Sequence, residues 1–178
     1  KKEVKKIYSI EIVKNIVRFC QPIVVNKILK KNAGKIISVV GDFDILQLGD
    51  NSIDFAISWF SVHHSNNVII TLKECLRVLK PGGKFVFIDK AYNNSTPDSE
   101  IERMLNIVYD KKFLKKNYLP EKTILTRRGY GEHEWRFFEW ERFIKKSGFK
   151  LITEIIFKTD TLENRQIKND NNLCEVLT

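Results

Sequence analysis

Three histidines have side chains that could carry out proton-transfer chemistry. His63 and His64 are adjacent, and His133 lies within residues 129–135 beside Tyr130. Imidazole titrates near neutral pH, so each could serve as a general base or bind a metal. Adjacent side chains point in different directions and no nearby Cys, Asp or Glu completes a ligand set, so we expect no metal. His64 and His133 remain candidate bases. The alternatives are a packed pocket wall for the pair and a helix-start or buried, hydrogen-bonded role for His133.

Residues 39–88 predict the elements that position these side chains. Three apolar runs, rich in β-branched and aromatic residues, lie at residues 36–40, 55–60 and 84–88. From Val68 to Leu79, apolar residues recur at spacings of three and four, which predicts an amphipathic helix. The sequence KPGG at residues 80–83 ends this helix, since proline cannot continue it and glycine favours a helix stop. The pattern is that of a parallel βαβ unit.

The flanking segments predict further elements of the same kind. We expect a short strand at residues 6–10 ending at Glu11, and helical stretches at residues 12–31 that are interrupted at Pro22. A helix at residues 138–147 precedes a strand at residues 149–158, and a last strand is expected at residues 173–177. Asp89 follows the strand that ends at Ile88. It either faces the substrate or has a structural capping role.

Several motifs, taken together, resemble a known family. They are GDFDILQLGDNSIDFAIS, then SVHH, a helix, RVLKPGGKFVFID and later FFEWERFIKKSGFKLI. In their order and spacing they resemble the class I methyltransferases that use S-adenosylmethionine, in particular the small-molecule, methyltransferase type 11-like branch. The resemblance runs from about residue 6 to residue 157. It implies a Rossmann-like three-layer sandwich with a mostly parallel sheet.

The resemblance also implies which residues hold the cofactor. Glu11, followed by Ile12, would accept hydrogen bonds from the ribose hydroxyls. Asp42, preceded by Gly41, would accept from the adenine amino group while the backbone N–H of Phe43 meets a ring nitrogen. The methionine end would be lined by Trp59, Phe60 and Ser61. The alternatives are an exposed helix-start carboxylate for Glu11 and an ordinary turn aspartate for Asp42.

The first strand of the family and its glycine-rich turn have no counterpart before Glu11, and the first residue is lysine. Loss of a central strand would leave the polar groups of two strand edges unpaired at a cost of several kcal/mol. We therefore expect the sequence to be a piece of a longer protein. The alternative is a fragment that neither folds well nor binds cofactor.

Composition sets the remaining bounds. The chain has 178 residues, 43% of them hydrophobic and 30% charged, which suits one domain, residues 1–178. Because the sequence has no apolar run of about 18 residues and no signal-type apolar core follows its first residues, we predict neither a membrane span nor an export signal. The three cysteines are scattered, which favours a reduced, cytoplasmic setting without a structural metal.

The long connection at residues 90–135 is the predicted substrate cover of the family. It contains a predicted helix at residues 99–114, followed by a basic stretch up to residue 128. The formal net charge of the whole chain is +9. This basic stretch forms either a solvated surface or a rim that attracts anions.

We therefore predict transfer of a methyl group from S-adenosylmethionine to an oxygen, or a nitrogen, of a small molecule, sugar or lipid-linked acceptor. One alternative is an RNA methyltransferase, which only the charge supports, and we do not expect nucleic acid as a partner. The other is a non-catalytic interaction protein with a methyltransferase fold. The absent glycine-rich turn is its only support.

Overall fold

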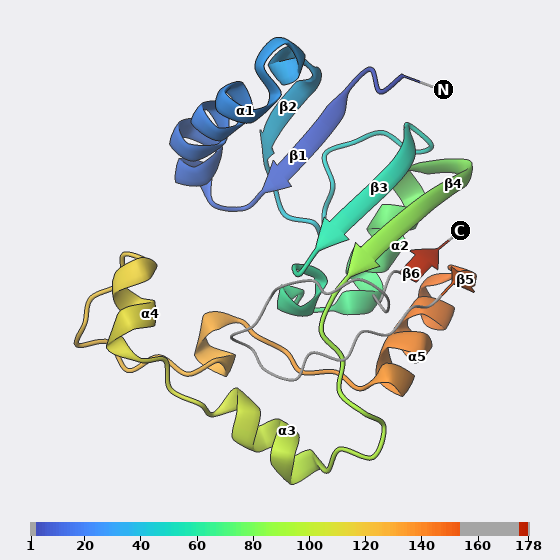
Figure 1. Ribbon diagram of the computed structural model, residues 1–178. Helices are drawn as coiled ribbons and strands as arrows, with labels where there is room; N and C mark the ends of the chain where they lie inside the picture. Colours follow the sequence, from blue (N-terminus) through green and yellow to red (C-terminus); the bar gives the residue numbers. More distant parts are fainter. Residues whose placement is uncertain (1–2, 154–174, 178) are drawn as a thin grey trace. The chain divides into compact units, whose positions relative to one another are not determined.

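The computed structural model describes residues 3–153 and 175–177 of the chain. The chain divides into two compact units, Lys1–Leu48 and Gly49–Thr178. Each unit contains a pair of parallel strands joined through helical segments (Figure 1). The predicted α/β class is therefore confirmed. Within the described residues, no helix combines the length and apolar character that a bilayer crossing requires.

The first unit is a βαβ unit. Strand β1 (Ile7–Glu11) pairs in parallel with β2 (Ile36–Val40), and in this register Glu11 lies opposite Val40. A π-helical turn (Ile16–Cys20), helix α1 (Gln21–Leu29) and a 3₁₀ turn (Lys30–Lys35) connect the two strands. The predicted interruption at Pro22 is confirmed to within one residue, because the π-helical turn ends at Cys20 and α1 begins at Gln21. Pro22 lies in the first turn of α1, where its missing N–H would have had no helical partner.

The second unit contains the longer sheet, with strand order β3-β4-β6-β5. Strands β3 (Ile53–Trp59) and β4 (Leu79–Ile88) are parallel, whereas β5 (Leu151–Thr153) and β6 (Glu175–Leu177) join by antiparallel pairing. Helix α2 (Val68–Val78) makes the crossover between β3 and β4. Its start is fixed by Asn67, whose side chain accepts the N–H of Ile70 at 3.3 Å. Residues 154–174, which include part of the strand predicted at 149–158, lie outside the described residues.

The predicted helix stop at the KPGG motif is wrong, because α2 ends at Val78 with an extended Leu79 as its C-cap and residues 80–83 lie within β4, which begins earlier than residue 84. The ladder of β3 and β4 passes from Ile53 opposite Leu79 directly to Phe55 opposite Lys84. The intervening residues are therefore accommodated as an irregularity within β4. Gly82 adopts a φ of 77° there, a left-handed conformation that side chains disfavour.

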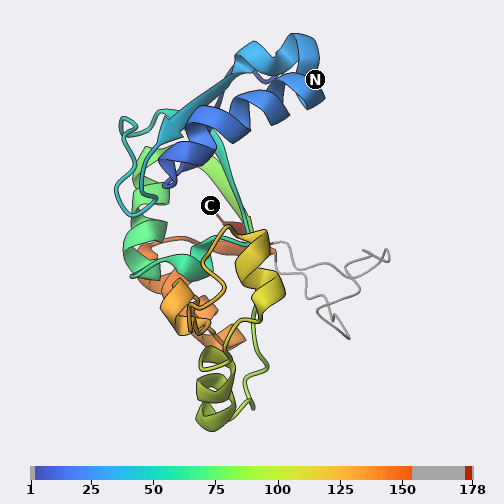
Figure 2. The same ribbon diagram turned by 90° about the vertical axis from the view of Figure 1, so that its left-hand side faces the viewer.

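The core of the second unit lies between its sheet and two helices. Helices α2 and α5 (Phe137–Ser147) lie side by side on one face of the sheet (Figure 2). Phe85 and Phe87 of β4 are each 1% exposed, and the Phe87 ring lies 5.3 Å from that of Trp140. Burial of such aromatic side chains stabilises the fold by roughly 1.5–3 kcal/mol each.

The connection at residues 90–135 carries two short helices instead of the single helix predicted at 99–114. Helix α3 (Asp98–Leu105) and helix α4 (Lys111–Lys116) are separated because Asp110 caps α4, its Oδ1 accepting the N–H of Phe113 at 2.7 Å. The apolar spacing of residues 99–114 therefore did not predict that the helix is interrupted before Asp110.

The two ends of this connection meet. The N–H of Tyr92 donates to the carbonyl of Trp135 at 2.8 Å, and the carbonyl of Tyr92 accepts from Phe137 at 3.1 Å. Both ends are thereby fixed next to the start of α5.

Candidate active site

The histidine pair is held where β3 ends. Phe60 takes a φ of 47°, and its N–H donates to the carbonyl of Ile88 at 2.7 Å, so the chain turns sharply beside the end of β4. A 3₁₀ turn (Val62–His64) follows directly. The carboxyl ends of parallel strands share one edge of a sheet, so this turn brings both imidazoles to the place where ligands bind in open α/β sheets.

His63 is buried and fixed by Asp89, the residue that follows β4. The Oδ1 atom of Asp89 lies 2.5 Å from His63 Nδ1, and its Oδ2 atom accepts the backbone N–H of His63 at 3.0 Å. Oδ1 also accepts the N–H of Lys90 at 2.8 Å. Because a carboxylate only accepts, Nδ1 of His63 carries a proton. Asp89 therefore orients the imidazole, which favours the structural alternative predicted for it.

His64 is half-buried, and its Nδ1 atom lies 3.0 Å from the carbonyl oxygen of Gly131. A carbonyl only accepts, so Nδ1 is the protonated nitrogen and Nε2 offers a lone pair. Burial lowers the pKa of His64, and the charge of His63 lowers it further, against the opposing effects of Gly131 and Glu132. His64 is thus biased toward its neutral, basic form.

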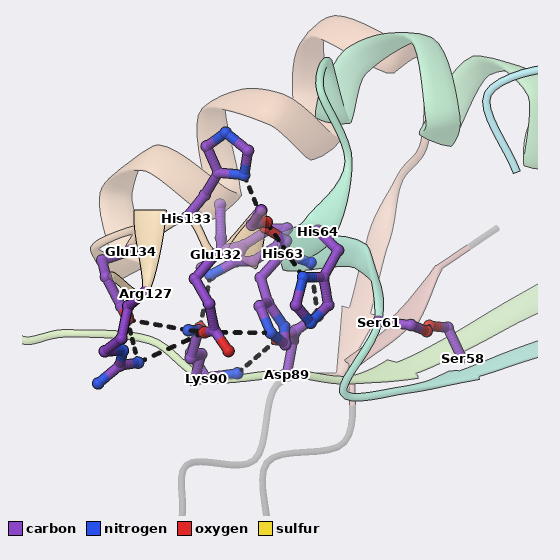
Figure 3. Close-up of polar contacts among 12 residues, drawn as sticks. Ser58, Ser61, His63, His64, Asp89, Lys90, Arg127, Glu132, His133 and Glu134 are labelled. Atoms are coloured by element: carbon purple, nitrogen blue, oxygen red, sulfur yellow. Dashed lines mark hydrogen bonds and ion pairs between the residues drawn. The ribbon is translucent and has the colours of Figure 1, made fainter. Parts of the chain in front are cut away.

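Residues 131–133 contact the histidine pair one after another. Gly131 accepts from His64, Glu132 lies with Oε2 3.6 Å from His63 Nε2, and His133 Nδ1 lies 2.9 Å from the carbonyl oxygen of His63 (Figure 3). The His133 ring points away from the other two imidazole rings and stacks on Trp135 with centroids 5.7 Å apart. The structure therefore brings His64 and His133 to the same turn but on different sides of it.

A buried cluster of charges adjoins His63. Lys90 and Arg127 both form ion pairs with Glu132 and with Glu134, and the Glu134 side chain is fully buried. Tyr109 donates to the second oxygen of Glu132 at 3.1 Å. Burial alone would raise the pKa of Glu132, but the hydrogen bond and charge of Lys90, helped by His63 and Tyr109, lower it to about 2. The cluster ties the end of β4 to the end of the 90–135 connection.

Two carboxylates lie together in the first unit. The backbone N–H of Gly41 donates to the carbonyl of Glu11 at 3.1 Å, so Glu11 and Asp42 stand at the carboxyl ends of neighbouring strands. Oε1 of Glu11 accepts the N–H of Val13 and Oδ1 of Asp42 accepts that of Asp44, each at 2.9 Å. One oxygen of each carboxylate is engaged locally, and the other can accept from a ligand.

Comparisons with known proteins show the fold and a family match over part of the chain. Residues 1–87 match the family described as "Methyltransferase domain". A SAM-dependent methyltransferase structure from Aquifex aeolicus superposes on 97% of this chain and 66% of its own, with a TM-score of 0.54 and 15% identity, which shows the fold. The fold of the chain is that of the class I methyltransferases. The predicted Rossmann-like fold is thereby confirmed.

Relatives in this family match over shorter stretches. Malonyl-[acyl-carrier protein] O-methyltransferase 1 of Coxiella burnetii is 40% identical over 60 residues, 34% of this chain and 21% of that protein. Sarcosine/dimethylglycine N-methyltransferase of Aphanothece halophytica is 37% identical over 73 residues, 41% of this chain and 26% of that protein. The matches thus span about a quarter of the length of these methyltransferases.

The other cofactor-binding residues that the family resemblance predicts are divided between the two units. Ile12 is 64% exposed beside Glu11, and Phe43 follows Asp42 after β2. In the second unit, Trp59 is 58% exposed at the end of β3, next to Phe60. Ser61 Oγ lies 2.6 Å from Ser58 Oγ, which fixes the turn that leads into the histidine pair. Each group thus stands at the carboxyl end of a strand in its own unit.

Sequence reasoning missed four charged residues of the site, Lys90, Arg127, Glu132 and Glu134. Their signal was weak because surface loops of this chain are rich in the same residue types. One clue was available, since Glu132 and Glu134 immediately flank His133 in a segment already singled out.

Proposed function

We propose that the protein transfers a methyl group from S-adenosylmethionine to an oxygen of a small molecule, sugar or lipid-linked acceptor, with His64 as general base. The observation that carries this proposal is the neutral tautomer of His64, whose Nε2 lone pair stands at the carboxyl edge of the β3–β4 sheet. A nitrogen acceptor is the second possibility within the same reaction.

Acceptor types differ in whether they need a general base. A hydroxyl must lose its proton as its oxygen attacks, and a base within hydrogen-bond reach accelerates that step by about 10²–10⁴. A carboxylate or an amine needs no such base. The names of the relatives cover both an O-methyltransferase and an N-methyltransferase. The presence of His64, held neutral by burial, favours a hydroxyl among these acceptors.

His133 is the weaker candidate for the base. Its Nδ1 atom faces the carbonyl of His63, so its tautomer leaves Nε2 free as well. However, its ring points away from the other imidazoles and stacks on Trp135 (Figure 3). We therefore assign it a positioning role, in which it fixes the backbone of His63.

The residues of the first unit fit S-adenosylmethionine. The open oxygen of Glu11 would accept from ribose hydroxyls, and that of Asp42 would accept from the adenine amino group. Gly41, Ile12 and Phe43 flank these carboxylates. When bound, the cofactor supplies an electrophilic methyl group on a sulfonium. The protein then aligns the acceptor and excludes water.

We propose that residues 90–135 select and cover the acceptor. Their end contacts the histidines through Gly131, Glu132 and His133, so an acceptor that reaches His64 must fit against this segment. The scattered cysteines favour a cytoplasmic reaction. The methyl transfer that we propose does not require a metal.

Calorimetric titration of S-adenosylmethionine tests the cofactor assignment. Asp42→Asn retains the oxygen that accepts the N–H of Asp44 but replaces the open acceptor by an NH₂ donor, so we expect at least a tenfold loss of affinity. Asp44→Asn removes the same charge two residues away and should bind like the wild type. Absence of binding to the folded wild-type protein would overturn the proposal. Binding that Asp42→Asn leaves unchanged would refute the role of Asp42.

A further inference from the structure

His63, His64 and Glu132 form a cluster of metal-ligand type. One ring nitrogen from each histidine and one carboxylate oxygen all lie within 4.8 Å of one another, and His63 Nε2 lies 3.6 Å from Glu132 Oε2. The ligands of a tetrahedral metal stand roughly 3.3 Å apart, given metal–ligand bonds of about 2.0–2.1 Å. The prediction that no acidic ligand lies near the histidine pair is therefore wrong. Glu132 is distant in the sequence, but the fold brings it next to both histidines.

The hydrogen bonds of both histidines leave Nε2 as the ring nitrogen that carries the lone pair. Nδ1 of His63 is protonated toward Asp89, and Nδ1 of His64 is protonated toward the carbonyl of Gly131. Such a carboxylate or carbonyl partner on the other ring nitrogen typically accompanies a metal-binding histidine, whose orientation it fixes. Nε2 is then the available ligand atom of each ring.

The contact between His63 Nε2 and Glu132 Oε2 favours a proton or a cation between the two atoms, in addition to the charges of Lys90 and Arg127 on the same carboxylate. A neutral His63 would place the lone pair of Nε2 opposite a carboxylate oxygen, and two acceptors repel each other at 3.6 Å. Either a proton on His63 or a metal ion relieves this repulsion. A metal would satisfy His64 at the same time, whereas a proton on His63 would not.

The cations beside Glu132 do not depend on it alone. Lys90 and Arg127 each also pair with Oε1 of Glu134, which is fully buried. Oε2 of Glu134 has no hydrogen-bond partner among the described residues and can accept from either cation. Glu134 can therefore hold both cations when Glu132 turns to a metal. With Asp89, which pairs with His63, three carboxylates stand against the two cations. This leaves one negative charge when His63 is neutral, which favours an added cation.

We propose that His63, His64 and Glu132 bind a divalent transition metal, with Zn²⁺ as the best fit. Two imidazoles and one carboxylate match the borderline preference of Zn²⁺, and three protein ligands leave a fourth position for water or an acceptor oxygen. The bound metal occupies Nε2 of His64, so the metal-loaded state and the free-base state are alternatives. The metal site does not rest on the proposed methyl transfer.

Calorimetric titration with ZnCl₂ after dialysis against a chelator tests the site without any turnover. Cys20 and Cys174 are replaced by serine beforehand so that their thiols do not contribute, while Cys75 is buried. We expect one equivalent of Zn²⁺ to bind with micromolar or tighter affinity. Titration with Co²⁺ should give the intense visible bands of tetrahedral coordination.

Three variants locate the binding. His64→Ala and Glu132→Gln should each weaken Zn²⁺ binding at least tenfold, whereas Glu102→Gln changes an exposed carboxylate that pairs with Arg128 outside the cluster and should leave it unchanged. Circular dichroism verifies that each variant is folded. Equal affinity in the wild type and in both ligand variants, or no stoichiometric binding by the folded wild type, would overturn the proposal.

Discussion

The carboxylate of Asp89 binds His63 twice, through the imidazole Nδ1 at 2.5 Å and through the backbone N–H at 3.0 Å. One side chain thus fixes both the ring and the main chain of the turn that carries His64. The pair is buried, so its hydrogen bonds are not exchanged with water.

Asp89→Asn should reduce both stability and activity. The amide replaces one acceptor oxygen by a donor, which then faces an N–H group, so we expect a loss of about 3 kcal/mol in the free energy of unfolding. The misplaced turn should lower kcat by about 10². Urea unfolding and steady-state kinetics measure these effects. The matched control is Asp54→Asn, whose carboxylate is exposed and pairs with Lys80. Equal effects of the two substitutions would contradict the role of Asp89.

The pH dependence of methyl transfer should report His64. Because burial lowers its pKa below the ordinary 6.5, His64 stays neutral as the pH falls through 6.5, and kcat/KM should decline only below that value. His64→Ala should lower the rate by about 10²–10⁴ and abolish this decline. His133→Ala should retain it. An acid limb that persists in His64→Ala would assign the base elsewhere.

The buried charge cluster should respond strongly to loss of Glu134. Glu134→Ala leaves Lys90 and Arg127 with only Glu132, so we expect the free energy of unfolding to fall by about 3–5 kcal/mol. Glu102→Ala breaks an exposed pair with Arg128 and should cost at most about 1 kcal/mol. Denaturant unfolding of both variants compares them directly. Similar losses would show that the cluster is solvated.

Glu132 should make the fold sensitive to acid. Its pKa is lowered from 4.5 to about 2 in the folded state, so its stabilising contribution is fully present above pH 4.5. That contribution is lost as the pH falls from 4.5 toward 2, where the folded state also becomes protonated. Thermal unfolding between pH 6 and 2.5 should show a smaller decrease of Tm with falling pH in Glu132→Gln than in the wild type. Parallel curves would argue against the ion pair with Lys90.

The strands and crossover helix could be predicted because their signals are local. Strand β1 ends at Glu11, β2 at Val40 and α2 at Val78, close to where the apolar spacing placed them. The break between α3 and α4 was missed. Its cause is a cap at Asp110 together with a bond from the N–H of Tyr109 to the carbonyl of Leu125, a partner that periodicity does not identify.

The candidate site could be predicted only in part, for a similar reason. His64 was found because its neighbours in the sequence carry the family pattern, but Glu132 lies far along the chain. Its contact with His63 exists only because the connection at residues 90–135 returns to the end of β4. The cofactor assignments of Glu11 and Asp42, and the single-domain organisation, stay predictions.

The two ends of the 90–135 connection lie together, so this proposed acceptor-binding segment could be exchanged as a unit. Tyr92 bonds to Trp135 and Phe137, so the segment begins and ends at one point. The entropy of closing such a loop grows only slowly with its length, by about 0.6 kcal/mol for each doubling. Residues near α4 can therefore be lengthened, shortened or replaced while Gly131 and Glu132 keep their contacts with the histidines. If this segment covers the acceptor as proposed, its exchange would change the acceptor and leave the proposed base in place.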